Sequence, residues 1–159
     1  MSRRDTTVLE AFLMRQGVQA RLLRLEQPTR TVAEAAQALG VSPHCIVKSL
    51  LFRTVDGNCV LAVVRGDQRV DRKLLAAALG YDQLTLAPAE QVVTVTGYPA
   101  GATPPVGHAT PIPVNVDPAV LEEAVVYGGG GDDHTMLEIR PEDIVRVSGA
   151  RVVRIAQFT

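Results

Sequence analysis

Hydrophobic positions along the chain follow two spacings, one typical of helices and one typical of strands. Apolar residues three and four positions apart, delimited by capping and stop signals, predict helices or helical turns. We expect these at 6–16 and 31–40, after 42, at 71–80, after 88 and at 141–143. Runs between turn signals predict strands at 18–25, 46–53, 59–64, 112–116, 124–127, 136–139 and 151–156. The interleaved order indicates a single α/β domain over residues 1–159, with a mixed β-sheet and surrounding helices.

Lys48 interrupts one of these apolar strands. Alternation along the strand puts Lys48 on the same face as Ile46, Leu50 and Phe52. A hydrophobic core would use that face, so the ammonium must reach an edge, find a partner or line a polar cavity. The strand alone is compatible with a lysine that reaches solvent and with a cation in a ligand pocket.

Composition narrows the setting of the protein. The 159 residues are 47% hydrophobic and carry a net charge of −1, so no global basic field indicates a nucleic-acid partner. Arginine is frequent among the first 30 residues. These arginines form either an ordinary solvated surface or a local basic patch. Two isolated cysteines, Cys45 and Cys59, suit a reducing cytoplasm better than a disulfide scaffold. We expect no leader peptide and no membrane span, because no apolar run approaches the length either requires.

Two glycine-rich segments are candidates for chemistry. Residues 96–107 contain three glycines and three prolines and cannot form a regular element. We call this segment the Gly/Pro loop; it suits a rigid pocket wall and, equally, a packed surface loop. The second segment, 128–131, lies between two predicted strands and precedes Asp132, Asp133 and His134. Its amides could bind an oxyanion or phosphate, although such a run is more often a flexible turn.

Other site types lack their signatures. The glycine run has neither the spacing of a dinucleotide-binding loop nor that of a P-loop. A zinc site would need four ligands at defined spacing. His44, Cys45 and His108 do not have such a spacing relative to Asp132, Asp133 and His134. No G-x-S-x-G elbow is present, and Cys45 reads as a structural thiol. We therefore expect neither metal nor cofactor.

Four motifs in sequence order resemble the YbaK/ProX aminoacyl-tRNA editing family, which is related to the editing domain inserted in bacterial prolyl-tRNA synthetases. The first two run over 31–52, with a T-x-x-E-A-A helix and a V-K-[ST]-L strand, and over 60–80. The fourth combines the glycine run with residues 137–143. The third is T-G-Y-x-x-G-x-x-x-P-x-G, matched by Gly97, Tyr98, Gly101, Pro105 and Gly107. The resemblance covers about residues 28–147.

The resemblance implies the family's α/β fold, with a mixed and partly barrel-like sheet. It implies a deacylase that acts in trans on mischarged tRNA, hydrolysing the ester between the amino acid and the 3′-terminal adenosine. Lys48 falls on the family's required lysine and is the candidate catalytic residue. The implied partners are aminoacyl-tRNA and an aminoacyl-tRNA synthetase, and the protein would be a monomer or homodimer. The candidate substrate-binding residues are Thr31, Gly97, Tyr98, Gly101, Ala102, Pro105, Gly107, Gly129, Gly130 and His134.

The chain departs from the family pattern in ways that affect the pocket. Ala102 replaces the second glycine of the usual G-G-I-S-P loop, and Glu138 stands where aspartate is common. In the last motif a glycine replaces serine and the segment is two residues longer. A leucine, Leu23 or Leu25, occupies the early strand where tyrosine is common. We therefore do not carry over the cysteine specificity of some family members to this chain. As the amino acid that is removed, alanine or another small one fits at least as well as cysteine. The alternative function is a non-catalytic module that binds aminoacyl-adenylate-like ligands, tRNA ends or a synthetase.

Overall fold

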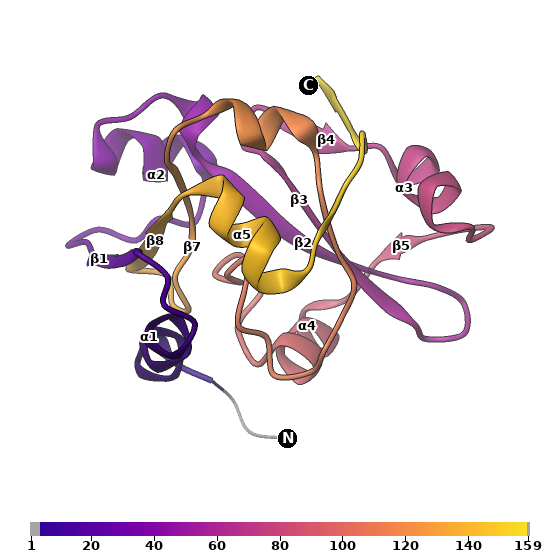
Figure 1. Cartoon of the computed structure of the whole chain (residues 1–159), viewed down its shortest axis with the longest axis horizontal. Coiled ribbons are helices and arrows are strands. Elements are labelled where there is room, and N and C mark those ends of the chain that lie inside the picture. Colours follow the sequence, from indigo (N-terminus) through magenta and orange to yellow (C-terminus); the bar gives the residue numbers. More distant parts are fainter. Residues whose placement is uncertain (1–3, 159) are drawn as a thin grey trace.

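A β-hairpin forms the centre of the fold. The computed structural model describes residues 4–158. Strands β2 (Val47–Arg53) and β3 (Cys59–Arg65) pair antiparallel along their whole length, as the apolar runs and the Asp56-Gly57 turn predict. Gly57 has a φ of +90°, a conformation that glycine adopts without steric cost. The hairpin is the long magenta pair that crosses the molecule in Figure 1.

A five-stranded sheet grows outward from this hairpin in the order β5-β2-β3-β6-β9. The added strands are short: β5 (Thr85–Leu86), β6 (Val114–Val116) and β9 (Arg151–Val152). Strand β6 runs parallel to β3 and β9 runs parallel to β6, whereas β5 is antiparallel to β2. The predicted mixed sheet is confirmed.

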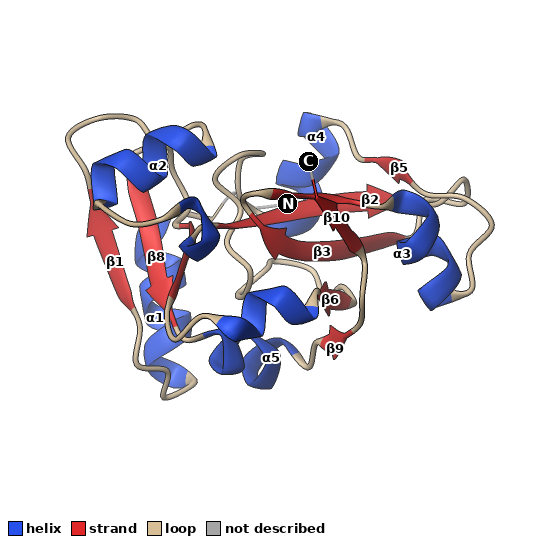
Figure 2. Cartoon of the chain, turned by 90° about the horizontal axis from the view of Figure 1, so that it is seen from above, coloured by secondary structure: helices blue, strands red, loops and turns tan. Residues whose placement is uncertain are grey.

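Two smaller sheets complete the strand arrangement. Strands β1 (Arg21–Arg24), β8 (Thr135–Ile139) and β7 (Val126–Gly129) form an antiparallel sheet in the order β1-β8-β7. A single parallel bridge from Ile46 to Tyr127 connects it to the start of β2. Figure 2 shows β1 and β8 on one side of the molecule and the hairpin on the other. Strand β10 (Ala156–Phe158) pairs antiparallel with β4 (Gln68–Val70).

Helices cover the sheets at positions that the sequence marks with caps. Thr31 and Glu34 form the predicted capping box, and Asp71 caps the next helix through two backbone amides. Gly40 and Gly80 end these two helices in the left-handed conformation. Two 3₁₀ turns, η1 (Pro43–Cys45) and η2 (Pro118–Glu122), precede or follow strands. The helices are α1 (Thr6–Arg15), α2 (Val32–Leu39), α3 (Arg72–Leu79), α4 (Ala89–Thr96) and α5 (Pro141–Ser148). Within residues 4–158, no helix has both the length and the hydropathy that a membrane span needs.

The hydrophobic core occupies both faces of the hairpin. Val47 and Leu51 point into the largest cluster, which includes side chains of α1 and α5. Phe52 points the other way, into a cluster that Leu75 of α3 completes. Ile46, on the same side of β2 as Lys48, is buried in a third, smaller cluster with α2. The sequence-based expectation that Lys48 shares a face with core residues is confirmed.

The structure corrects several element boundaries. The strand expected at 151–156 is broken into β9 and β10, because the buried Asp117 carboxylate accepts hydrogen bonds from the amides of Ile155 and Ala156. The helical turn expected at 141–143 continues to Ser148 as α5. The strand expected at 124–127 instead spans Val126–Gly129, so two glycines of the run belong to β7. Strands β4 and β5 were not expected from the sequence.

Candidate active site

A cavity of about 230 Å³ lies beside the first half of β2, and we call it the Lys48 cavity. It contains four of the residues that the sequence singles out: Lys48, Thr31, Gly101 and Gly129. Its walls come from α2 and the segment before it, from β2, from the Gly/Pro loop and from β7 and β8. Segments more than 80 positions apart in the sequence thus meet around one lysine. The remaining lining residues are Thr29, Arg30, Val32, Ala35, Ile46, Val47, Ser49, Leu50, Thr103 and Met136.

Lys48 is half-buried, and within residues 4–158 it makes one hydrogen bond. Its Nζ donates to the main-chain carbonyl of Gln68 on β4, which is a neutral group. Burial lowers the pKa of the Lys48 ammonium, and the Arg69 cation lowers it further, while the Asp67 carboxylate opposes the shift. An ammonium has three N–H donors, so this single bond leaves donors for a ligand.

The exposed part of the Gly/Pro loop forms the wall opposite β2. Gly101 has a φ of +85° and open space around its Cα, so it approaches the cavity without a side chain. The next residues, Ala102 and Thr103, lie against β7. A Cβ on Gly129 would lie 2.4 Å from the Thr103 carbonyl oxygen and 2.7 Å from that of Ala102. Gly129 is therefore what allows the loop to pack this closely on the strand.

The other loop residues named by the sequence point into the protein. Tyr98 is fully buried in the largest core cluster. Gly97 and Gly107 have positive φ, and a Cβ on Gly107 would lie 3.1 Å from the Phe12 ring of α1. Pro105 is buried under β7. None of these four residues lines the Lys48 cavity, and Gly107 and Pro105 pack the loop against α1 and β7.

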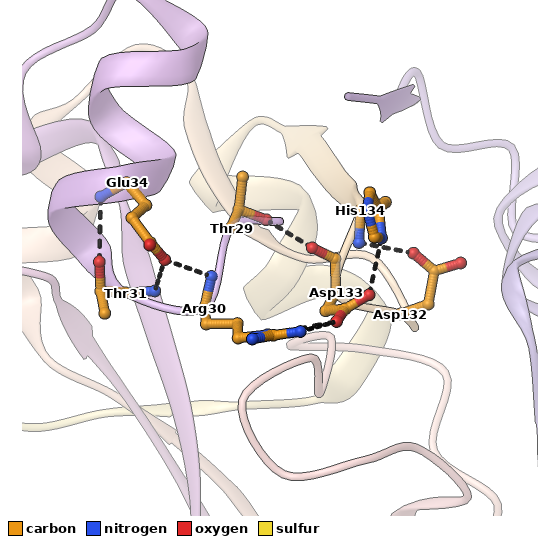
Figure 3. Close-up of polar contacts among 7 residues, drawn as sticks. All are labelled: Thr29, Arg30, Thr31, Glu34, Asp132, Asp133 and His134. Carbon is orange, nitrogen blue, oxygen red and sulfur yellow. Dashed lines mark hydrogen bonds and ion pairs between the residues drawn. The ribbon is translucent and has the colours of Figure 1, made fainter. Parts of the chain in front are cut away.

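A polar cluster extends from Arg30, which lines the Lys48 cavity (Figure 3). The Arg30 guanidinium donates to Asp133 Oδ2 at 3.2 and 3.3 Å, and His134 Nδ1 lies 2.7 Å from Asp133 Oδ1. The hydrogen bonds with His134 and then with Arg30 hold the pKa of Asp133 below its usual range. The Asp133 carbonyl accepts from the Thr29 amide at 2.8 Å, which fixes the β7–β8 turn to the segment before α2.

His134 and Gly130 thus occupy positions beside the cavity. The His134 ring contacts the Asp133 carboxylate and is not among the lining residues. Gly130 packs on β8, where a Cβ would lie 2.7 Å from the Thr135 carbonyl oxygen. Ala102 lines a neighbouring cavity of about 480 Å³ together with Asp132. The two cavities share Arg30 and Gly101, so Arg30 marks the boundary between them.

Acidic and sulfur side chains near the site are engaged with other groups. Asp132 lies 3.7 Å from Arg24, and Asp133 binds Arg30. Within the described part of the chain, no three His, Cys, Asp or Glu side chains gather as a metal site. Cys45 Sγ lies 3.4 Å from Glu123 Oε1, and burial followed by that hydrogen bond raises the pKa of the thiol. Cys45 therefore stays protonated, which is typical of a structural thiol.

Sequence reasoning missed several residues of the site. Arg30 directly precedes the capping box. Its position just before the start of a helix was the one sequence feature that could have marked it as a site residue. Ser49 lies inside the V-K-[ST]-L motif, next to Lys48, and attracted no attention of its own. The Gln68 carbonyl gave no signal, because any residue at that position presents the same main-chain oxygen.

The fold agrees with the comparisons to known proteins. The chain belongs to the aminoacyl-tRNA editing domain family, which matches residues 26–147. Crystal structures with similar folds include the hypothetical protein APE2540, 39% identical with a TM-score of 0.89, covering 94% of this chain and 99% of that one. A protein proposed to be a trans-editing enzyme for prolyl tRNA synthetase is 32% identical with a TM-score of 0.88, covering 96% of each chain.

Sequence relatives fall into free-standing proteins and parts of synthetases. The uncharacterized protein YwhH of Bacillus subtilis is 31% identical over 127 residues, which are 80% of each chain. The proline–tRNA ligase of Nitratidesulfovibrio vulgaris is 46% identical over 85 residues, which are 52% of this chain and 15% of the ligase. The family predicted from the four motifs, and its relation to prolyl-tRNA synthetases, are confirmed.

Proposed function

We propose that the protein is an aminoacyl-tRNA deacylase that acts in trans, in the cytoplasm, on the ester of mischarged tRNA. The observation that carries the proposal is the half-buried Lys48, which shares one cavity with Gly101 and Gly129 in a member of the aminoacyl-tRNA editing domain family. In this proposal Lys48 is a fixed positive charge, and aminoacyl-tRNA is the partner.

The chemistry asks little of the protein, because an aminoacyl ester is already activated. Water attacks the carbonyl carbon and the bond from that carbon to the 3′ oxygen breaks. One proton of the water ends on the 3′ oxygen, and the amino acid leaves as a carboxylate after releasing the other. The site must hold the ester and stabilise the negative charge that develops on the carbonyl oxygen. The free N–H donors of Lys48 suit that second task, since a cation in a partly dehydrated site interacts strongly with an oxyanion.

The cavity favours a small amino acid. Its volume of about 230 Å³ is below the range typical of pockets for drug-sized ligands. Apolar side chains, including Val32, Ala35 and Met136, form much of its wall. Alanine and other small residues therefore fit the proposal better than large aromatic ones.

One observation favours the alternative of a non-catalytic binding module. No carboxylate or imidazole is among the described residues that line the Lys48 cavity, so these residues offer no general base there. Catalysis would then need a water that the substrate itself orients. A protein that binds the 3′ end of aminoacyl-tRNA without hydrolysing it would show the same lining.

A deacylation assay separates the two functions. The purified protein is mixed with tRNA charged with alanine, cysteine, serine or threonine, and loss of the ester is followed against a protein-free control. Hydrolysis of at least one substrate well above the spontaneous rate supports the deacylase. Protection of the ester without turnover supports the binding module, and neither protection nor turnover on any substrate contradicts both.

A further inference from the structure

The Lys48 cavity lies along the edge of strand β2. Four consecutive residues of the strand, 47–50, line it. Successive side chains of a strand point to opposite faces of the sheet. One cavity can therefore contact four in a row only from the edge, where the main chain is accessible.

Hydrogen bonds at both ends of the hairpin establish which main-chain groups face that edge. The Ile46 carbonyl accepts from Gly66 at 2.7 Å, and the Thr54 amide donates to Asn58 at 2.9 Å. In an antiparallel pair every second residue bonds to the partner strand, so the even-numbered residues of β2 bond to β3. The odd-numbered Leu51 confirms this alternation, because its carbonyl accepts from the Ala87 amide at 2.9 Å on the edge away from β3. The Ser49 amide and carbonyl therefore point away from β3, toward the cavity.

The open stretch of this edge is one residue long. Before it, the bridge from Ile46 to Tyr127 brings β7 alongside the strand. After it, Ala87 bonds to Leu51. Between them, on this edge, no β-bridge within residues 4–158 includes Ser49, and Ser49 Oγ is buried without a partner. Unpaired polar groups beside a cavity call for a ligand or water.

We infer that the main chain of Ser49 binds the aminoacyl group as one residue of an antiparallel ladder. The inference rests on the proposed function. The Ser49 amide donates to the ester carbonyl, and the Ser49 carbonyl accepts from the α-ammonium of the amino acid. An aminoacyl ester carries the donor and the acceptor that one residue of a strand exchanges with its partner, and the gap has room for one residue.

This arrangement assigns two tasks to one residue. The Ser49 amide becomes a main-chain donor to the developing oxyanion, in addition to Lys48. The Ser49 carbonyl recognises the α-amine of an amino acid whatever its side chain. Selection among amino acids is then left to the apolar walls of the cavity.

Two substitutions at Ser49 test the main-chain donor. Ser49→Pro removes the amide hydrogen at an edge position, where proline is tolerated because no ladder bond is lost. We expect kcat/KM for the best tRNA substrate to fall about 100-fold, as for loss of one oxyanion donor. Ser49→Ala removes the same hydroxyl and keeps the amide, so its rate is the reference against which Ser49→Pro is compared. A folded Ser49→Pro protein that hydrolyses as fast as Ser49→Ala would overturn the inference.

A binding experiment on the unmodified chain covers the case in which Ser49→Pro does not fold. The ¹⁵N-labelled protein is titrated with 3′-(L-alanylamino)-3′-deoxyadenosine, which cannot be hydrolysed as an ester, and with its propionyl counterpart, which lacks the amine. We expect a downfield shift of the Ser49 amide proton with the first ligand and about tenfold weaker binding of the second. Equal affinities, or saturation without a shift at Ser49, would contradict the inference. If no ligand binds and no charged tRNA is hydrolysed, the proposed function fails instead.

Discussion

Two cations near one end of the hairpin have opposite surroundings. Arg65, on β3, is 8% exposed, and its guanidinium donates to both oxygens of Asp67 at 3.0 and 2.7 Å. Lys48, on β2, projects from the other face of the sheet, because Arg65 is paired with Val47. It contacts the neutral carbonyl of Gln68. The hydrogen bond with Asp67 raises the pKa of Arg65, whereas burial lowers the pKa of Lys48.

The contrast separates a cation that serves stability from one that is available for function. A guanidinium held by a carboxylate has its charge balanced, so removing it leaves the fold weaker. The charge of an ammonium that is bonded to one neutral carbonyl is poorly compensated. A negatively charged ligand would therefore stabilise the charged form. A cation that is expensive to keep in the folded protein is a candidate for a site.

The largest effect is expected for Lys48→Ala. Loss of the positive charge that faces the ester should lower kcat/KM about 100-fold. The melting temperature should not fall, because the half-buried ammonium has little to stabilise it. Lys73→Ala, at the only other lysine and on an exposed position of α3, is the control and should leave the rate unchanged. A Lys48→Ala protein with wild-type turnover would remove Lys48 from the proposed mechanism.

Arg65→Met should show the reverse pattern. Methionine fills similar space but loses the charge-assisted hydrogen bonds, so the free energy of unfolding should fall by about 2 kcal/mol. Turnover below the melting transition should change little, because Arg65 does not line the cavity. Urea unfolding compares it with Arg53→Met, an exposed arginine at the other end of the hairpin. A large loss of turnover in Arg65→Met without loss of stability would break the distinction between the two cations.

Gly129→Ala tests the wall opposite Lys48. The added methyl would meet the Thr103 carbonyl, so the loop must move, at a cost of about 1–2 kcal/mol of unfolding free energy. Hydrolysis should slow as well, since the displaced wall borders the cavity. Gly128→Ala is the matched control, because its methyl would meet the Val47 side chain at 3.0 Å rather than backbone. Equal rates for the two variants would show that the position of the loop does not matter.

The smallest effect is a shift in pH dependence. The lowered pKa of Lys48 means that the enzymatic rate, after subtraction of spontaneous ester hydrolysis, should decline at a lower pH than an ordinary lysine titrates. The free energy of unfolding should change with pH in the direction opposite to the rate, rising where the rate declines. The unfolded chain binds more protons between the folded and ordinary pKa values, so the unfolding free energy of wild type should rise with pH there, relative to Lys48→Met. Lys48→Arg should lose the alkaline decline, and an unchanged profile would contradict the assignment.

Local signals in the sequence predicted the parts of the fold that local chemistry determines. The capping box of Thr31 and Glu34, the Asp71 cap and the turn at Gly57 depend on residues within a few positions of one another. The same holds for the hairpin and for Lys48 on its apolar face. The helix α5 was predicted as a single turn at 141–143, but it spans Pro141–Ser148.

Contacts between distant segments could not be predicted in the same way. The pair of Arg30 and Asp133 joins residues 103 positions apart, and Arg30 lines both cavities. Asp117 breaks the last predicted strand from 38 positions away. The division of the Gly/Pro loop into a cavity-facing part and an anchoring part also depends on α1 and β7, which the loop sequence does not specify. The catalytic and binding roles of these residues stay predictions.

The pairing of β4 with β10 has a consequence for the order in which the protein is made. Gln68, whose carbonyl holds Lys48, lies on β4, and the partner of that strand is Ala156–Phe158. On the ribosome the chain emerges from its N-terminus, so β10 follows every other element described here. Lys48 and the hairpin are synthesised early, but the strand that supports the lysine gains its partner only after the other described elements have been made. A nascent chain would therefore complete the support of Lys48 only after every other described element has emerged.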